Sequence, residues 1–191
     1  MARTYKYKRE EIIEEAYNLV KEDGVDHLTA RELGKRLDSS SKIIFGSFKN
    51  MDDLKEEVIE YGYSKYSEKM KEALRSTRYK GYISCGLAYI SIAKEEPNIF
   101  KMLFMRDTTN ERKVYTDSSI NLIYEIISSR GNITIEEAKD VTNRYWFVMH
   151  GIATSIATNF MNLDDEYIIE LLKDNFESII KNIKEKKGIL Q

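Results

Sequence analysis

The sequence is poor in cysteine, proline and glycine. Among the 191 residues Cys85 is the single cysteine, Pro97 is the single proline, and there are nine glycines. One cysteine excludes an intramolecular disulfide and a cysteine-rich metal site. Because proline and glycine are the residues that most often interrupt helices, their scarcity favours long uninterrupted helices.

Long apolar runs are also absent. No window reaches 18 apolar residues, which is about the length that a transmembrane helix needs. The N-terminal segment MARTYKYKRE is basic, but no apolar stretch follows it as in a signal peptide. We therefore expect a cytoplasmic protein with no membrane partner.

The familiar catalytic motifs are missing as well. The sequence contains no glycine-rich phosphate loop, no G-x-S-x-G elbow and no H-E-x-x-H pair. Its two histidines and one cysteine lie far apart in the sequence. We therefore expect no enzyme activity, no metal and no cofactor.

Apolar residues recur at helical spacing in nearly every segment, which predicts an all-α fold of about nine helices. Hydrophobic residues make up 42% of the chain and charged residues 32%, so a buried core is expected. The predicted helices are Lys8–Glu22, Thr29–Leu37, Lys42–Phe48, one capped by Asn50, and five within Tyr79–Ala93, Asn98–Met105, Ser118–Ser128, Glu136–Phe160 and Asp165–Lys184.

Capping signals define several helix ends. Thr29 and Glu32 form the T-x-x-E pattern of a capping box, and Thr134 and Glu137 repeat it. Gly24 is expected to end the first helix as a left-handed cap.

Charge is segregated although the net charge is only −2. Four bases and no acid precede Glu10, namely Arg3, Lys6, Lys8 and Arg9. Five bases and two acids lie between positions 31 and 49. Such local positive charge is what a phosphate-binding face requires, and its binding should weaken with salt.

The stretch TARELGKRLDSSSKIIFGSFKNMDDL, Thr29 to Leu54, resembles the helix-turn-helix of the TetR (tetracycline-repressor-like) regulators without insertion or deletion. Thr29, Leu33, Ser40, Phe48 and Leu54 match the family pattern, and the resemblance extends back to about Lys8. The sequence departs from the pattern at Phe45, where tyrosine is usual, and at Asp38, Ser39 and Met51. Met51 replaces a lysine that usually contacts phosphate.

The resemblance implies that residues 1–54 form a helix-turn-helix domain that binds double-stranded DNA at a palindromic operator. The expected contacts are Thr29, Ser39, Ser40, Ser41, Lys42, Phe45, Lys49 and Lys8. Phe48 is expected in the core. Of Ile43 and Ile44, one should pack inside while the other could touch a thymine methyl.

The resemblance further implies that residues 55–191 form a helical ligand-binding and dimerisation domain. One apolar seam has the 3, 4, 3, 4 spacing of paired helices: Ile169, Leu172, Phe176, Ile179 and Ile183. This seam favours a homodimer interface, although an ordinary core within one chain would have the same spacing.

Aromatic and methionine side chains gather in the same domain, as they do in ligand pockets and in ordinary cores. The candidate ligand residues are Tyr89, Phe100, Phe104, Tyr124, Trp146, Met149 and His150. The sequence therefore predicts a homodimeric transcription repressor released from its operator by an unknown small hydrophobic ligand. The alternative is a dimeric helical protein-interaction module, or a regulator without an inducer.

Overall fold

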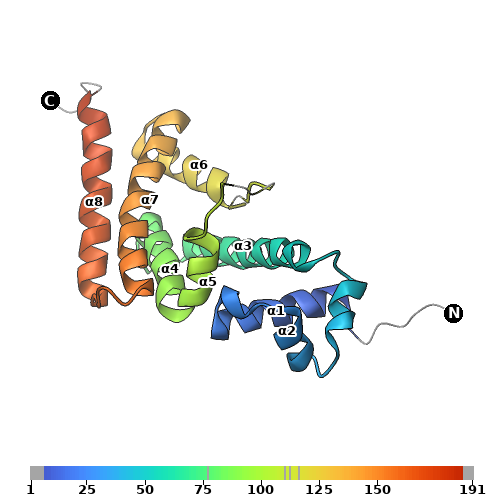
Figure 1. The fold of residues 1–191 in the computed structure, drawn as a ribbon. Coiled ribbons are helices and arrows are strands. Elements are labelled where there is room, and N and C mark those ends of the chain that lie inside the picture. Colours follow the sequence, from blue (N-terminus) through green and yellow to red (C-terminus); the bar gives the residue numbers. More distant parts are fainter. Residues whose placement is uncertain (1–6, 77, 110, 112, 116, 187–191) are drawn as a thin grey trace. The chain divides into compact units, whose positions relative to one another are not determined.

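The structure is a computed structural model that describes residues 7–76, 78–109, 111, 113–115 and 117–186. Within these ranges the chain is all-α, with no strand (Figure 1). This confirms the predicted fold class and helix number. The elements are α1 (Arg9–Asp23), η1 (Val25–His27), α2 (Ala30–Arg36), η2 (Ser41–Gly46), α3 (Met51–Arg75), α4 (Gly81–Glu95), α5 (Pro97–Phe104), α6 (Ile120–Gly131), α7 (Ile135–Ala157) and α8 (Asp165–Lys186), where η marks a 3-10 helix.

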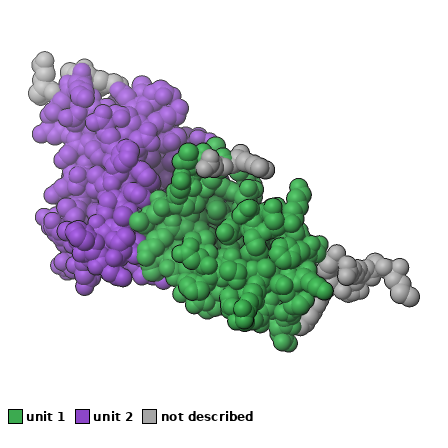
Figure 2. Space-filling view, viewed as in Figure 1, with its two compact units in different colours: residues 1–65, 96–115 green, residues 66–95, 116–191 purple. Residues whose placement is uncertain are grey.

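The chain forms two compact units, coloured separately in Figure 2. Unit 1 comprises residues 1–65 and 96–115, and unit 2 comprises residues 66–95 and 116–191. Helix α3 contributes to both units, and α5 belongs to the N-terminal one. These units differ from the expected division after residue 54. None of the helices in the described ranges has the length and apolar character needed to cross a membrane.

The helix starts follow the capping signals, with one difference. Thr134 and Glu137 form the complete capping box of α7. At α2 the Thr29 hydroxyl accepts a hydrogen bond from Glu32 N (3.2 Å), but Thr29 N donates to His27 O (2.8 Å). Because that donor is already used, the Glu32 carboxylate pairs with Lys35 Nζ instead (2.8 Å). Only half of the predicted box therefore forms.

Gly24 ends α1 as predicted, but not as a left-handed helical cap. Its φ of 91° and ψ of 163° lie in a region that is open to glycine and closed to most other residues. Its N–H still donates to Val20 O (2.8 Å), which satisfies one of the last carbonyls of the helix.

In unit 1, α5 is held against α1 by polar contacts. Tyr17 Oη donates to a Glu96 carboxylate oxygen (3.0 Å), and Lys21 Nζ pairs with the other oxygen (2.8 Å). Asn98 Nδ2 donates to Lys21 O (3.2 Å) at the end of α1. The burial of Tyr17 and the adjacent Glu96 charge both raise the pKa of the Tyr17 phenol, so it stays protonated as a donor.

In unit 2, helices α4, α7 and α8 meet at Gly86. A Cβ at Gly86 would lie 2.8 Å from Leu172 Cδ1 and 3.0 Å from Tyr145 Oη. Leu172 is fully buried, and α8 lies alongside α7 (Figure 1). The missing side chain at Gly86 is what allows this close approach.

Replacement of Leu172 by alanine should lower the free energy of unfolding by about 3 kcal/mol, because it leaves a cavity against Gly86. The matched change Leu171→Ala, at the half-buried neighbour, should cost less than about 1.5 kcal/mol. Denaturant unfolding of both variants measures the difference. Equal losses would mean that α8 does not present Leu172 to α4.

Candidate nucleic-acid interface

The turn between α2 and η2 packs directly on α2. A Cβ at Gly34 would lie 3.0 Å from Ser41 N and 3.2 Å from Ser39 O. Ser39 N donates to Gly34 O (2.9 Å), and Asp38 adopts a positive φ of 43°. Asp38 replaces a glycine of the family pattern, and aspartate tolerates this conformation better than most residues. Gly34 is a positioning residue that the sequence analysis missed; a glycine inside a helical stretch was its signal.

The predicted third helix is a six-residue 3-10 helix, η2, shifted slightly toward the turn. The adjacent β-branched Ile43 and Ile44 and the terminal Gly46 favour a short 3-10 helix over a longer α-helix. Residues three apart eclipse in a 3-10 helix, so Lys42 and Phe45 lie on the same face.

The two faces of η2 differ in burial. Ile44 and Phe48 are buried in unit 1, which confirms the prediction for Phe48 and identifies Ile44 as the inward isoleucine. Lys42 is exposed, Ile43 is half-buried, and Phe45 is 51% exposed. Exposure of a phenylalanine beside a lysine leaves one apolar and one cationic contact available on the outer face of η2.

The predicted hydroxyls lie at helix starts. Thr29 and Ser40 are exposed, whereas Ser39 and Ser41 are half-buried. Thr29 already caps α2, and Ser40 occupies the cap position of η2. Helix N-termini with hydroxyl residues are common phosphate contacts in DNA-binding proteins.

Only some of the counted bases are available. Arg36 pairs with Glu15 (3.4 Å), Glu22 and Asp23 (3.2 Å), which raises the pKa of its guanidinium. Arg9 pairs with Glu57 (3.1 Å).

Arg9 also covers the Phe48 ring, at 4.2 Å from its centroid. Its guanidinium therefore has partners within unit 1. Arg3 and Lys6 of the basic arm lie outside the described residues.

Four exposed cations remain without an ion pair to any residue that the structure describes: Lys8, Arg31, Lys42 and Lys49. Arg31, in the first turn of α2, was not among the predicted contacts, although the local charge count included it. Lys49 precedes α3, where its N–H donates to Asp53 (2.9 Å) and Asn50 caps Asp53 N (2.8 Å).

The predicted ligand residues are divided between the two units. Phe100 and Phe104 belong to unit 1, and the other five belong to unit 2. Trp146 and Met149 line a small, partly open cavity of about 70 Å³. Ligand pockets are usually several times larger, so this cavity as it stands holds only water-sized molecules.

The remaining candidates of unit 2 make core contacts. Tyr89 is fully buried, and its hydroxyl bonds with His150 Nδ1 (2.9 Å). His150 stacks on Trp146 with ring centroids 4.5 Å apart, and burial lowers the pKa of His150. Tyr124 is half-buried on α6.

Most of the predicted dimer seam is core. Leu172, Phe176 and Ile183 are buried within the single chain, and Ile169 and Ile179 are half-buried. Three of the five seam residues therefore pack inside unit 2, where α8 contacts α4 and α7.

A different apolar surface of unit 2 is open. Phe147 on α7 is 69% exposed, and Phe160, Met161 and Tyr167 around the α7–α8 link are also exposed. A Cβ at Gly151, one turn after Phe147, would meet nothing within 4 Å.

Comparisons with known proteins bear on the fold only. No protein-family model matches the chain, and no curated protein matches it. Among solved structures, the chain is similar to a protein with unknown function from Rhodococcus sp. RHA1, with a TM-score of 0.71 and 17% identity over 94% of this chain and 98% of that one.

Among the described residues there is no group of three or more histidine, cysteine or acidic side chains placed to hold a metal ion.

Gly34→Val should destabilise unit 1 by about 2 kcal/mol, because its side chain meets the backbone of Ser39 and Ser41. Lys35→Val is the matched control: it places the same side chain on the next, exposed position of α2, where the lower helix propensity of valine costs less than about 1 kcal/mol and the loss of the exposed Glu32 pair adds little. Denaturant unfolding followed by far-UV circular dichroism measures both. Similar losses for the two variants would contradict the tight packing of the turn at Gly34.

Proposed function

We propose that the protein is a DNA-binding transcription regulator of the TetR kind, which reads duplex DNA with the α2–turn–η2 segment of unit 1. The observation that carries the proposal is that η2 has one buried face and one exposed face. Ile44 anchors its inner face, while Lys42 and Phe45 share the exposed face. A helix that served only as core would not need an exposed aromatic beside an unpaired lysine.

The chemistry of this face suits DNA. Lys42, Lys49 and Arg31 can each neutralise a phosphate, and every neutralised phosphate releases counterions. Phe45 offers an apolar surface of the kind that contacts a thymine methyl. Thr29 and Ser40 supply hydroxyls at two helix starts, where backbone N–H groups also favour phosphate.

Within this proposal the protein acts as a repressor that a small apolar ligand releases from its operator. A ligand can release the protein only by binding the state with lower DNA affinity more tightly.

The proposal predicts that duplex binding weakens steeply with salt and depends on the turn cations. Selection from a random duplex library should yield a palindromic site. Lys42→Gln combined with Lys49→Gln should lower the slope of log affinity against log salt by about two, one for each lost phosphate contact. Fluorescence anisotropy across a salt series measures this slope.

The control removes two exposed lysines elsewhere, with Lys101→Gln on α5 and Lys173→Gln on α8. It makes the same change in net charge and should leave the slope nearly unchanged. The proposal fails if the control and the turn variant lose affinity equally, or if no duplex binds.

The open apolar surface of unit 2 supports a second copy as its partner. A palindromic site is bound by a two-fold dimer, and a two-fold interface uses the same patch on both copies. Phe147 and Tyr167 supply aromatic contact area, and Gly151 permits close approach of a facing helix.

Phe147→Arg should therefore convert a dimer into a monomer at micromolar concentration, because it places a charge in the centre of the interface. Val114→Arg introduces the same charge at a more exposed apolar side chain of unit 1 and should leave the dimer intact. Sedimentation velocity distinguishes the states. A wild-type protein that is monomeric at these concentrations would contradict the proposed assembly.

A further inference from the structure

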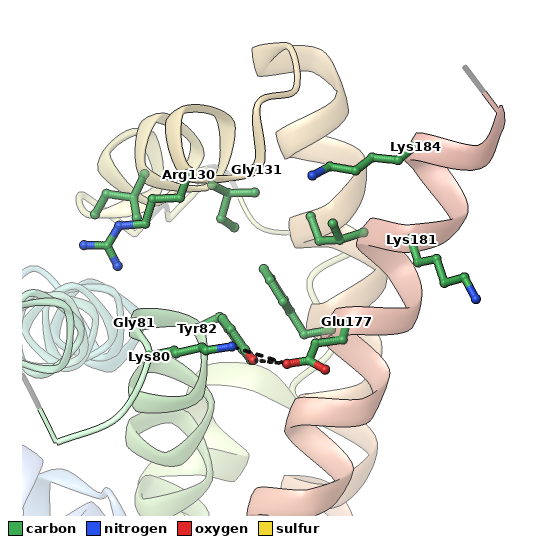
Figure 3. Close-up of a pocket in the computed structure, with 12 residues that line it drawn as sticks. Lys80, Gly81, Tyr82, Arg130, Gly131, Glu177, Lys181 and Lys184 are labelled. Atoms are coloured by element: carbon green, nitrogen blue, oxygen red, sulfur yellow. Dashed lines mark hydrogen bonds and ion pairs between the residues drawn. The ribbon is translucent and has the colours of Figure 1, made fainter. Parts of the chain in front are cut away.

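Unit 2 contains a second hollow, a surface cleft of about 480 Å³. The start of α4, the end of α6 and the C-terminal half of α8 enclose it (Figure 3). Its volume lies within the range of small-molecule sites. The sequence analysis did not indicate this cleft, because its walls come from three segments far apart in the chain.

The floor of the cleft is apolar. Tyr82 and Phe176 stack with ring centroids 3.9 Å apart and an interplanar angle of 5°. Tyr145 meets Phe176 edge to face, with a centroid separation of 5.1 Å. The other apolar walls are Ile126, Ile127 and Ile180. An apolar chain or ring laid on this floor would be removed from water.

The acidic residue that lines the cleft already has partners. Glu177 Oε1 accepts from Tyr82 Oη at 3.3 Å and pairs with Lys80 Nζ at 3.4 Å (Figure 3). Burial and the neighbouring Glu177 charge raise the pKa of the Tyr82 phenol to about 12. Tyr82 therefore stays neutral and adds no negative charge to the floor.

Two cations at the cleft have no ion pair within the part of the chain that the structure describes. Lys184 extends from α8 toward the end of α6, whereas Lys181 points away from the cleft (Figure 3) and lies 3.7 Å from Glu185. Arg130 Nη1 lies 3.8 Å from the position that a Cβ on Gly81 would take, so its guanidinium lies near the start of α4. Arg130 and Lys184 thus line the apolar cleft as two separate cations, whose side chains extend in different directions (Figure 3).

We propose that this cleft binds an amphipathic carboxylate, attracted by the positive charge of Arg130 and Lys184, with an apolar chain along Tyr82, Phe176 and Ile180. Each cation can hold a carboxylate by charge-assisted hydrogen bonds, and both raise the positive potential at the cleft. The smaller pocket beside Trp146 adjoins this cleft, because Tyr82, Ile126 and Ile127 line both. The inference concerns binding to unit 2 alone and does not rest on DNA binding.

The test uses the full chain without DNA and dodecanoate as the probe, below its micellar concentration, with isothermal titration calorimetry. We expect one site per chain. Dodecan-1-ol, which keeps the chain but not the charge, and acetate, which keeps only the charge, should each bind at least about tenfold more weakly. A tenfold change corresponds to about 1.4 kcal/mol.

Variants then locate the site. Arg130→Gln combined with Lys184→Gln should weaken dodecanoate binding at least about tenfold, since charge-assisted hydrogen bonds are lost. Lys181→Gln changes the charge of the same helix and should alter the affinity less than twofold. Thermal unfolding without ligand verifies that the variants are folded, as expected because Arg130 and Lys181 are exposed and Lys184 is only half-buried.

Three outcomes would overturn the proposal: no dodecanoate binding, equal binding of dodecanoate and dodecan-1-ol, or equal losses for Lys181→Gln and the double variant. The first outcome would mean that the cleft binds no such ligand. The second would mean that the carboxylate does not contribute to binding. The third would mean that the loss of affinity comes from the net charge of the protein and not from Arg130 and Lys184. Each can occur whether or not the protein binds DNA, so failure here and failure of the DNA proposal remain distinguishable.

Discussion

The close approach of α4 to α7 and α8 at Gly86 governs the architecture of unit 2. With Leu172 seated where a Cβ would be, the register between α4 and α8 is fixed. One helical turn away on both helices, that register brings Tyr82 onto Phe176, because each lies four residues from the first pair. The cleft floor is therefore a direct consequence of a core contact, and any side chain at Gly86 would disturb both.

Unit 1 also depends on close packing at a glycine. Gly34 lets the turn backbone lie on α2, which sets where η2 begins. Because Ile44 and Phe48 are then buried, Lys42 and Phe45 are left on the outside. Exposure of these two side chains follows from core packing, and the DNA-binding proposal depends on that packing as much as on charge.

Local signals in the sequence were enough to predict the helices and their ends. Thr134 and Asn50 mark helix starts, and helical spacing located α4 to α8 to within a few residues. Pairing over long sequence distances could not be read in this way. The charge count included Arg36, whose partners lie 13 to 21 residues away, and heptad spacing could not distinguish a dimer seam from the core that contains Leu172.

Helix α4 is the chain segment that leads from the cleft of unit 2 to Glu96, where the chain enters unit 1. Its first residues, Gly81 and Tyr82, line the cleft, and its last residue is followed by Glu96, which bonds to Tyr17 and Lys21 of α1. Glu96 is therefore reached from Tyr82 along a single helix. Coupling between the proposed ligand and the proposed DNA contact would appear as an equal effect of dodecanoate on DNA affinity and of DNA on dodecanoate affinity.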